Sequence, residues 1–474
     1  MTTAVVVGSG PNGLAGAIRL AQAGVEVTVI EAGQRPGGGT RTSELTLPGV
    51  LHDDCAAFHP TGVASPYLAS LGLERHGLNW LWPEIDLAHP LDDGRAGLAG
   101  RDDALTDSLG ADAASWRRMF RSAVRNFDNL TAEIFRPILH VPRHPIALGK
   151  FGMHAAMPSS LAVRRFKDEP AKALFTGVAA HAFHRLDTPF SSSVGMMLTA
   201  AAHAVGWPVA EGGTESITRA LLAELAAHGG QVITGTRVTS LDQLRELTGS
   251  KPDIVLLDTA PAGVLDIVGD ALPARVRRAL TRYSYGPAAF KVDFAIQGDI
   301  PWTNPDVRRA GTVHIGGSAA QIAQVEAATV RGQMAEQPFV LLGQQYLTDP
   351  SRSTAEANPI YAYAHVPHGY TGDATEAIIN QIERFAPHFR DQIVATSTRN
   401  PAELEAYNAN YVGGDISAGA NTARQIVLRP RIALNPYALG LKGVYLCSSA
   451  TPPGAGVHGM GGFHAAEAAL KELR

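Results

Sequence analysis

Cysteine and long apolar runs are both scarce in this chain. Only Cys55 and Cys447 occur among 474 residues, which excludes a disulfide framework and a C-x-x-C redox pair. No apolar run reaches the roughly 20 residues that a helix needs to cross a bilayer, so any membrane contact is expected to be peripheral. The first apolar strand begins within a few residues, leaving no room for a signal peptide. We therefore expect a cytoplasmic protein.

Charged and aromatic residues are also few. They make up 18% and 7% of the chain, against 45% apolar residues, and a net charge of −4 gives no electrostatic reason to expect nucleic-acid binding. No histidine set has metal-ligand spacing, and no G-x-S-x-G elbow indicates a serine nucleophile. The length exceeds that of a single core, so we expect two intertwined domains.

What is present begins with a glycine motif between two apolar strands. Gly8, Gly10 and Gly13 have the G-x-G-x-x-G spacing and follow a strand predicted over 4–7. A helix follows, and a strand over 25–30 ends on Glu31. Gly8 permits the tight turn, Gly10 lets a pyrophosphate approach the helix N-terminus, and Gly13 lets the helix lie close on the sheet. We expect the Glu31 carboxylate to accept hydrogen bonds from ribose hydroxyls.

A second glycine loop indicates which dinucleotide is bound. Arg35, Gly37, Gly38 and Thr42 form the pattern R-x-G-G-x-x-x-T directly after Glu31. Its backbone can approach a cofactor, and Arg41 and Thr42 can donate to phosphate oxygens. Together the two motifs resemble the FAD-binding start of the amine oxidase and phytoene desaturase superfamily, so the resemblance implies FAD.

The C-terminal region resembles the same superfamily. Residues 443–470 predict a short strand, a glycine-rich loop and a helix starting near Met460. The stretch from Thr451 to Met460 is similar to the phytoene-desaturase-related branch that includes the pyridine nucleotide-disulfide oxidoreductase domain-containing proteins. Ser448 and Ser449 depart from the Gly-Asp or Gly-Ala of many relatives. The resemblance also implies that a strand through Arg237 and Val238 presents its backbone to the adenine.

These motifs and the resemblance predict a set of cofactor-binding residues and a domain division. The fold class is α/β, with a discontinuous Rossmann-type FAD domain over 1–84, 201–269 and 426–474 and a mixed α/β substrate domain over 85–200 and 270–425. The predicted cofactor-binding residues are Gly8, Gly10, Pro11, Asn12, Gly13, Glu31, Ala32, Gly38, Gly39, Thr40, Arg41, Thr42, Val238, Ser449, Gly456, Val457, His458 and Met460.

The substrate segments carry weaker signals. Between Ser115 and Phe135, apolar residues recur every three or four positions with arginines on another face. This pattern fits either a helix on an anionic membrane surface or a core-packed helix with a solvated basic face, and we favour the second. Met153, Met157, Met196 and Met197 indicate an adaptable apolar lining or core filler. The turn-rich residues 408–421 are expected to cap the pocket.

Catalytic residues are harder to predict, because a flavin supplies the hydride chemistry itself. His59 and His458 fall in motifs expected near the flavin, and we predict that one or the other lines the substrate cavity. For His59, a hydrogen-bonded structural histidine is an equally good interpretation. The function predicted is an FAD-dependent oxidoreductase of desaturase type. Its small apolar substrate, unsaturated or isoprenoid-like, loses a hydride to flavin N5. The alternatives are a flavin amine oxidase, disfavoured by the lack of a Trp or Tyr pair near the C-terminal motif, and a non-catalytic FAD-binding interaction protein.

Overall fold

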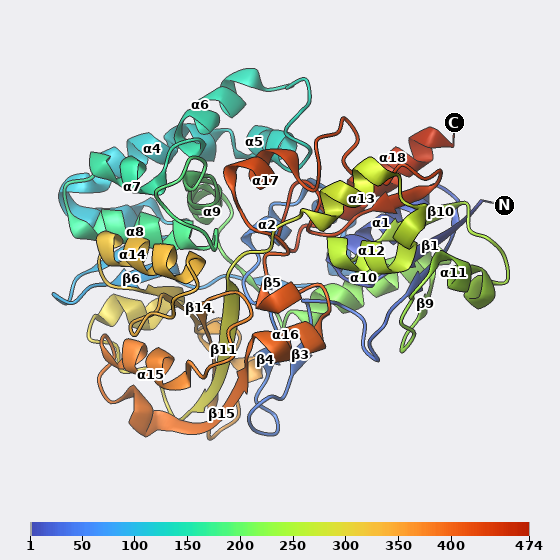
Figure 1. Ribbon diagram of the computed structural model, residues 1–474. Helices are drawn as coiled ribbons and strands as arrows, with labels where there is room; N and C mark the ends of the chain where they lie inside the picture. Colours follow the sequence, from blue (N-terminus) through green and yellow to red (C-terminus); the bar gives the residue numbers. More distant parts are fainter. Residues whose placement is uncertain (1, 474) are drawn as a thin grey trace.

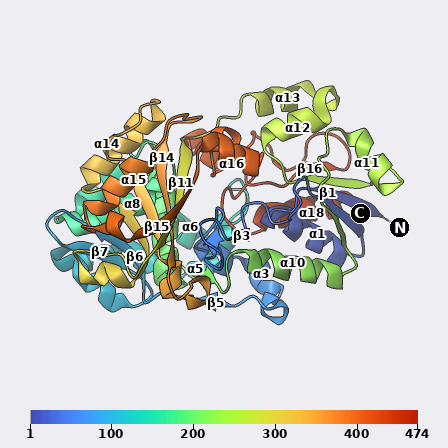
Figure 2. The ribbon, with the colours of Figure 1, turned by 90° about the horizontal axis from the view of Figure 1, so that it is seen from below.

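The computed structural model describes residues 2–473, which form two large sheets on opposite sides of the molecule (Figures 1 and 2). One is a five-stranded parallel sheet close to both chain ends, and the other is a seven-stranded mixed sheet. The predicted α/β fold class is confirmed. No helix within residues 2–473 combines the length and the apolar character needed to cross a membrane.

The parallel sheet brings its functional residues to one edge. In spatial order its strands are β16 (Val444–Leu446), β10 (Ile254–Leu257), β1 (Thr3–Val7), β2 (Glu26–Ile30) and β9 (Gln231–Ile233). Val7 of the central strand pairs with Ile30 on one side and Leu257 on the other. Since all neighbours run parallel, the next residues, Gly8, Glu31 and Asp258, emerge together at the carboxyl edge.

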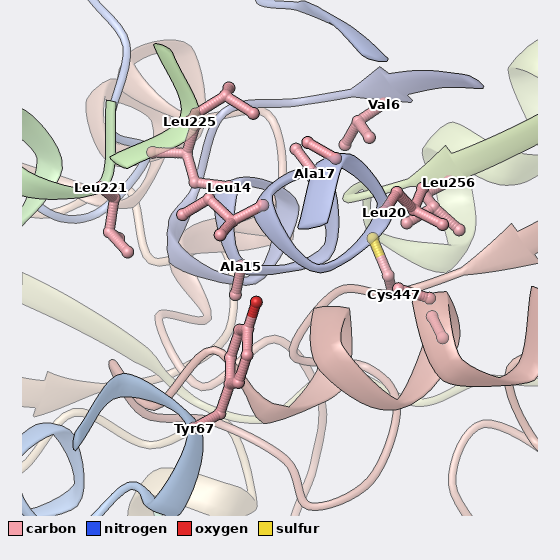
Figure 3. Packing of buried hydrophobic residues seen from close by; sticks show 14 of the residues in the cluster. Val6, Leu14, Ala15, Ala17, Leu20, Tyr67, Leu221, Leu225, Leu256 and Cys447 are labelled. Carbon is pink, nitrogen blue, oxygen red and sulfur yellow. The ribbon is translucent and has the colours of Figure 1, made fainter. Parts of the chain in front are cut away.

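Both faces of this sheet are covered by helices. Ala4 and Val6 pack with one group of helices, and Val5 and Val7 with another, as the period-2 alternation of a strand requires. The first group is α1 (Pro11–Gln22), α10 (Glu215–Ala227) and α18 (Met460–Glu472). The second group is α11 (Leu241–Thr248), α12 (Pro261–Val268) and α13 (Ala274–Thr281). Figure 3 shows Leu14 and Leu20 of α1 among the buried side chains of the first face.

Glycines allow α1 to pack closely against its neighbours. A Cβ on Gly13 would lie 2.2 Å from the carbonyl oxygen of Gly8, and one on Gly462 of α18 would lie 1.7 Å from that of Asn12. A Cβ on Gly16 would likewise come close to Gly462 and Leu256. Larger residues would force the two helices apart, so the small residues set the position of the α1 N-terminus.

The mixed sheet is covered mainly on one face. In spatial order its strands are β15 (Ile393–Arg399), β11 (Ala288–Ile296), β14 (Asn358–Val366), β13 (Val340–Gly343), β12 (Ala310–Ile315), β6 (Ile85–Pro90) and β7 (Ala96–Ala99). The covering helices are α4 (Ala113–Arg125), α5 (Phe127–Ile134), α6 (Pro145–Ala155), α7 (Ser159–Ala162), α8 (Glu169–Ala180), α9 (Ser192–Ala204) and α14 (Ala319–Val330). On the other face, α15 (Thr375–Glu383) packs against the strands.

Short elements join the two halves. They are the pairs β3 (Thr42–Ser43) with β4 (His52–Asp53) and β5 (Trp80–Leu81) with β8 (Val209–Ala210), and the helices α2 (Pro60–Val63), α3 (Pro66–Ser70), α16 (Pro401–Tyr407) and α17 (Ala423–Leu428). The strands of the parallel sheet fall in 1–84, 201–269 and 426–474, and those of the mixed sheet fall in 85–200 and 270–425. The domain boundaries themselves stay a prediction.

Two predicted elements differ from the structure. The helix predicted over 115–135 is broken at Asn126, whose backbone (φ −118°, ψ 33°) is not helical and whose side chain donates to the Ser122 carbonyl. Asparagine favours such ends because its amide competes for backbone partners. The strand predicted through Val238 is wrong: β9 ends at Ile233, and Gly235 (φ +68°) then turns the chain so that its N–H donates to the Gly33 carbonyl.

Candidate functional site

A cavity of about 1130 Å³ connects the carboxyl edge of the parallel sheet with the helices above the mixed sheet. Residues from the glycine loops and the C-terminal loop line one part of it. The other part is lined by α5, α6 and α9 and by strands β13 and β14. One continuous space therefore joins the predicted dinucleotide site to an apolar region.

The first glycine loop prepares an anion site at the start of α1. Gly8 has φ +102°, and Gly10 is the N-cap of the helix, with Pro11 at its first turn. Gly10 and Pro11 line the cavity, whereas Gly13 lies behind it. The N–H of Gly13 donates to Asp258 Oδ2 at 2.9 Å. The remaining N–H groups and the positive helix end favour a phosphate there.

Glu31 lies beside this loop with most of its hydrogen-bonding capacity already used. Its Oε2 accepts from the Ser9 N–H at 3.0 Å and the Ser9 hydroxyl at 2.6 Å, and its Oε1 accepts from the Gly33 N–H at 2.8 Å. Arg41 Nη2 lies 3.6 Å from Oε1. A carboxylate has about four lone-pair positions, so one acceptor position remains for a ribose hydroxyl. Glu31 and the neighbouring Ala32 both line the cavity.

The second glycine loop lies against the first. A Cβ on Gly38 would lie 3.0 Å from the Cα of Gly10. Gly38, Gly39, Thr40 and Arg41 all line the cavity, but Thr42 does not. The Thr42 hydroxyl donates to Asp53 Oδ1 at 3.1 Å and accepts from the Glu215 N–H at 3.1 Å. These contacts tie the loop to α10, so the structure does not place Thr42 as a phosphate donor.

The C-terminal loop closes the site through Asn12. The Asn12 side chain donates to Ser449 Oγ at 3.3 Å and accepts from the Gly461 N–H at 3.2 Å, joining α1 to α18. Ser449, Gly456 and Val457 line the cavity. Met460 begins α18 as predicted, but its side chain is buried in the core behind the loop. Val238 lines the cavity from irregular backbone beyond β9.

The two predicted catalytic histidines have different positions. His458 lines the cavity and is 1% exposed; its Nδ1 accepts from the Met460 N–H at 3.1 Å. Its Nε2 has no hydrogen-bond partner among residues 2–473. Burial lowers the pKa of His458 to about 4. His59 is fully buried outside the cavity lining, with Nε2 3.0 Å from the Thr214 hydroxyl. The cavity position expected for His59 is therefore wrong, because α2 turns its ring toward Trp80.

Several lining residues could not be found from the motifs. Asp258 and Arg429 are far from the glycine motifs in sequence, and His181 lies in no motif; all three line the cavity. So do the tyrosines Tyr361, Tyr363, Tyr407 and Tyr411, which come from β14 and from the predicted capping stretch or just before it. Their spacing carries no signal, because only the folded sheet brings them together. The lack of a Trp or Tyr pair near the C-terminal motif therefore does not mean that the cavity lacks aromatic residues.

The four methionines have four different environments. Met197 lines the cavity, Met196 is a core residue, and Met153 is 65% exposed. Met157 is half-buried outside the lining. Of the four, only Met197 is placed as lining.

The stretch predicted to cap the pocket contributes to its wall. Asn408, Tyr411 and Ile416 line the cavity with neighbours from the same stretch. The capping role itself stays a prediction.

Comparisons with known proteins agree with this geometry. The family model described as NAD(P)-binding Rossmann-like domain matches residues 6–71, which contain both glycine loops and Glu31. Pyridine nucleotide-disulfide oxidoreductase domain-containing protein 2 of Mus musculus is 22% identical over 99% of this chain and 94% of that protein. A phytoene desaturase (lycopene-forming) of Paracoccus sp. is 24% identical over 97% of this chain and 95% of that protein. The comparisons show a Rossmann-like dinucleotide-binding domain over residues 6–71 and a full-length similarity to oxidoreductases.

Solved structures share the fold along the whole chain. An oxidoreductase from Methanosarcina mazei has a TM-score of 0.66 at 15% identity, covering 99% of this chain and 100% of the other. A putrescine oxidase bound to putrescine has a TM-score of 0.62 at 17% identity, covering 100% and 99%. The predicted resemblance to the desaturase and amine oxidase superfamily is confirmed, and the relatives support FAD as the cofactor.

The residues present fit an FAD. A side chain at Gly38 would meet the backbone of Gly10, and one at Gly10 would meet Asp258. The buried Nε2 of His458 lacks a partner among the described residues. The α1 N-terminus suits the pyrophosphate, and Glu31 keeps one position for the ribose. Arg41 and Arg429 supply positive charge in the lining. Which of these residues contact the cofactor stays a prediction.

We expect Glu31→Ala to weaken FAD retention by roughly 10- to 100-fold. The variant loses the ribose acceptor and the contacts that hold Ser9 and Gly33, and hydrogen bonds to charged groups contribute about 1.5–3 kcal/mol. The dissociation constant of FAD, measured by fluorescence titration of apoprotein, checks this. Glu26→Ala, at the exposed start of the same strand, is the matched control. Equal retention in both variants would contradict the assigned role.

Proposed function

We propose that the protein is an FAD-dependent oxidoreductase that takes a hydride from an apolar, unsaturated or isoprenoid-like substrate. The bound flavin would supply the hydride acceptor at its N5. The observation that carries the proposal is the single cavity that joins the dinucleotide edge to an apolar region. The chain's own task is then to hold both partners and to exclude water.

The apolar walls suit an extended hydrocarbon chain. They include Leu148, Phe151, Phe190, Val194, Met197 and Leu198. The carboxylate in this region, Glu133, is 1% exposed and already has three protein partners. Its Oε1 accepts from the N–H groups of Arg143 and His144, and its Oε2 bonds to His140. An ammonium group would have to share this carboxylate with those partners, so its burial among the apolar walls is costly.

His458 is not arranged as a proton acceptor in this proposal. Its Nδ1 already accepts from the Met460 N–H, so the neutral ring carries its proton on Nε2, and the lowered pKa keeps it neutral. We assign to His458 a hydrogen-bond donor role toward the cavity. Transfer of the hydride to the flavin needs no protein base. The second hydrogen of the desaturation leaves the neighbouring carbon as a proton, which would pass to solvent.

The two alternatives are less well supported by the cavity. An amine oxidase has support from the fold of putrescine oxidase and from the four lining tyrosines, but Glu133 has three protein partners and offers a diamine at most one acceptor position. A non-catalytic binding protein is expected to have a closed or missing substrate cavity, whereas this cavity holds about 1130 Å³.

Peripheral membrane contact is part of the proposal, and residues 115–135 have the core-packed arrangement that the sequence analysis favoured over a membrane-bound one. Arg117 of α4 forms ion pairs with Asp103 and Asp107. Trp116 and Phe120 of the same helix pack in the core. Exposed apolar side chains occur instead at Ile138, Leu139, Val141, Ile146 and Met153. The same segment lines the cavity through Ile138, Leu148 and Phe151. A lipid-soluble substrate would enter there.

The proposal predicts which compounds reduce the flavin. Under anaerobic conditions, polyenes, terpenoids or long-chain unsaturated compounds should bleach the flavin absorbance of the holoenzyme, whereas amines and amino acids should not, because Glu133 beside the apolar walls already has three protein partners. Stopped-flow absorbance at the flavin band measures this. Bleaching by the amine panel alone would establish the amine oxidase alternative, and bleaching by neither panel would favour the non-catalytic one.

A further inference from the structure

Several polar groups on the cavity wall are occupied by protein partners. The Tyr361 hydroxyl donates to the Cys55 carbonyl at 2.6 Å, and the Tyr407 hydroxyl donates to the Gly38 carbonyl at 3.0 Å. The Trp207 indole N–H donates to the Leu198 carbonyl at 3.2 Å. These side chains therefore present mainly their apolar surfaces to a ligand. Two others, Tyr363 and His181, are different.

Tyr363 has a hydroxyl that is open to the cavity. The residue lies in β14, lines the cavity and is 6% exposed. Within residues 2–473 no group is hydrogen-bonded to its hydroxyl, and that oxygen is not among the fully buried unpartnered atoms. Burial of the ring raises the pKa of Tyr363, so the hydroxyl keeps its proton and can donate it to a ligand oxygen.

His181 offers a second open polar atom. It follows α8 and lines the cavity, with its ring edge-on to Trp207 at 5.4 Å between centroids. Its Nε2 bonds to His314 Nε2 at 2.8 Å, which leaves Nδ1 for the cavity. Burial lowers the pKa of His181 to about 3 and holds the pKa of His314 well below its usual range. Both rings are therefore neutral hydrogen-bonding groups.

Phe183 holds the ring of Tyr363 in place. Its backbone has φ +47°, an uncommon value for a bulky residue. Its ring stacks on Tyr363 at 5.9 Å and on His365 at 3.8 Å. His365 is in turn paired with the fully buried Glu326. Strain of this kind persists only where the surroundings impose it, and it is common at ligand sites.

We propose that Tyr363 and His181 form a polar subsite that binds an uncharged oxygen of the substrate, either a hydroxyl or a carbonyl. This inference deepens the proposed function and rests on it. The Tyr363 O–H donates to the ligand oxygen. His181 Nδ1 donates to a carbonyl or hydroxyl, or accepts from a hydroxyl, according to its tautomer. Neither residue carries a charge, so the subsite selects against an ammonium or a carboxylate. The substrate is thus an oxygenated apolar compound rather than a plain hydrocarbon.

Matched ligands and variants test this subsite by binding. Farnesol, farnesal, farnesene and farnesylamine share one C15 chain and differ in its terminal function. Their dissociation constants for the holoenzyme are measured from the quenching of tryptophan fluorescence, without turnover. Tyr363→Phe removes only the hydroxyl. His181→Gln keeps a polar atom near Nε2 for His314, and His181→Asn keeps one near Nδ1 for the cavity.

We expect farnesol and farnesal to bind more tightly than farnesene and farnesylamine. Tyr363→Phe and His181→Gln should each weaken binding of the oxygenated ligands by roughly 2- to 12-fold, the range of a neutral hydrogen bond, with farnesene unchanged and His181→Asn close to wild type. Equal binding of all four ligands, tighter binding of farnesylamine, or no binding would overturn the subsite. If His181→Gln loses its flavin, Tyr363→Phe decides alone. Tight farnesol binding without flavin bleaching would support the subsite while counting against the proposed hydride transfer.

Discussion

Gly8→Ala is expected to yield protein that is largely colourless and less stable to heat. Gly8 has φ +102°, where a non-glycine residue costs about 1–3 kcal/mol. Its new Cβ would also lie 2.8 Å from the Asp258 carbonyl oxygen, a backbone atom that no side-chain rotation can move away. Overpacking adds roughly 1–3 kcal/mol. The turn that aims the α1 N-terminus at the pyrophosphate must therefore shift.

Gly24→Ala separates the two causes. Gly24 follows the other end of α1 and has φ +80°, but a Cβ there would meet nothing within 4 Å. This control has backbone strain without the contact and lies away from the cavity. Flavin absorbance per protein and the midpoint of thermal unfolding measure both effects. A flavin content for Gly8→Ala equal to that of Gly24→Ala would mean that the close approach to Asp258 is unimportant.

The parallel sheet and its edge were predictable because their signals are local. A strand, three glycines and an acidic residue at fixed spacing dictate how β1, α1 and β2 connect, and a helix start at Met460 follows from its glycine-rich loop. The same local reasoning failed at Asn126 and Val238. There the decisive groups are a capping amide and the turn at Gly235. The spacing of apolar residues does not reveal either of them.

The substrate half was less predictable because its contacts are distant in sequence. Tyr363 and His181 share a cavity only because the fold brings a residue of β14 and the end of α8 to the same space. His59 shows the converse: it follows a cofactor motif closely, yet α2 buries it outside the cavity. Most residues chosen from the motifs line the cavity, whereas His59, chosen because it follows a motif closely, does not.

Asp258 places an ionisable group at the α1 N-terminus that the motifs did not indicate. It follows β10, is 7% exposed, and accepts from the Gly13 N–H at 2.9 Å. Burial, with a smaller effect of the nearby Glu31, raises the pKa of Asp258 from 3.8 to about 7. Since the folded pKa is raised, the protonated carboxyl stabilises the fold below about pH 4. That contribution declines as the pH rises and is lost above about pH 7.

The same proton should couple FAD retention to pH. An ionised Asp258 repels the pyrophosphate expected at the helix end, so FAD should bind roughly tenfold more weakly at pH 8 than at pH 6. Asp258→Asn keeps an oxygen for the Gly13 N–H and removes the charge, which should abolish this difference and tighten binding at pH 8. FAD dissociation constants between pH 6 and pH 8 measure the effect.

Asp266→Asn is the control for that pH dependence, because Asp266 also lines the cavity but is exposed on α12. It should keep the wild-type pH dependence, since its charge lies in water, where pairwise interactions are weak. The same pH dependence in Asp258→Asn as in wild type would assign the proton to another group. A flat wild-type profile would show that FAD and an ionised Asp258 do not repel each other. In either case Asp258 would serve only to hold the first turn of α1 through the Gly13 N–H.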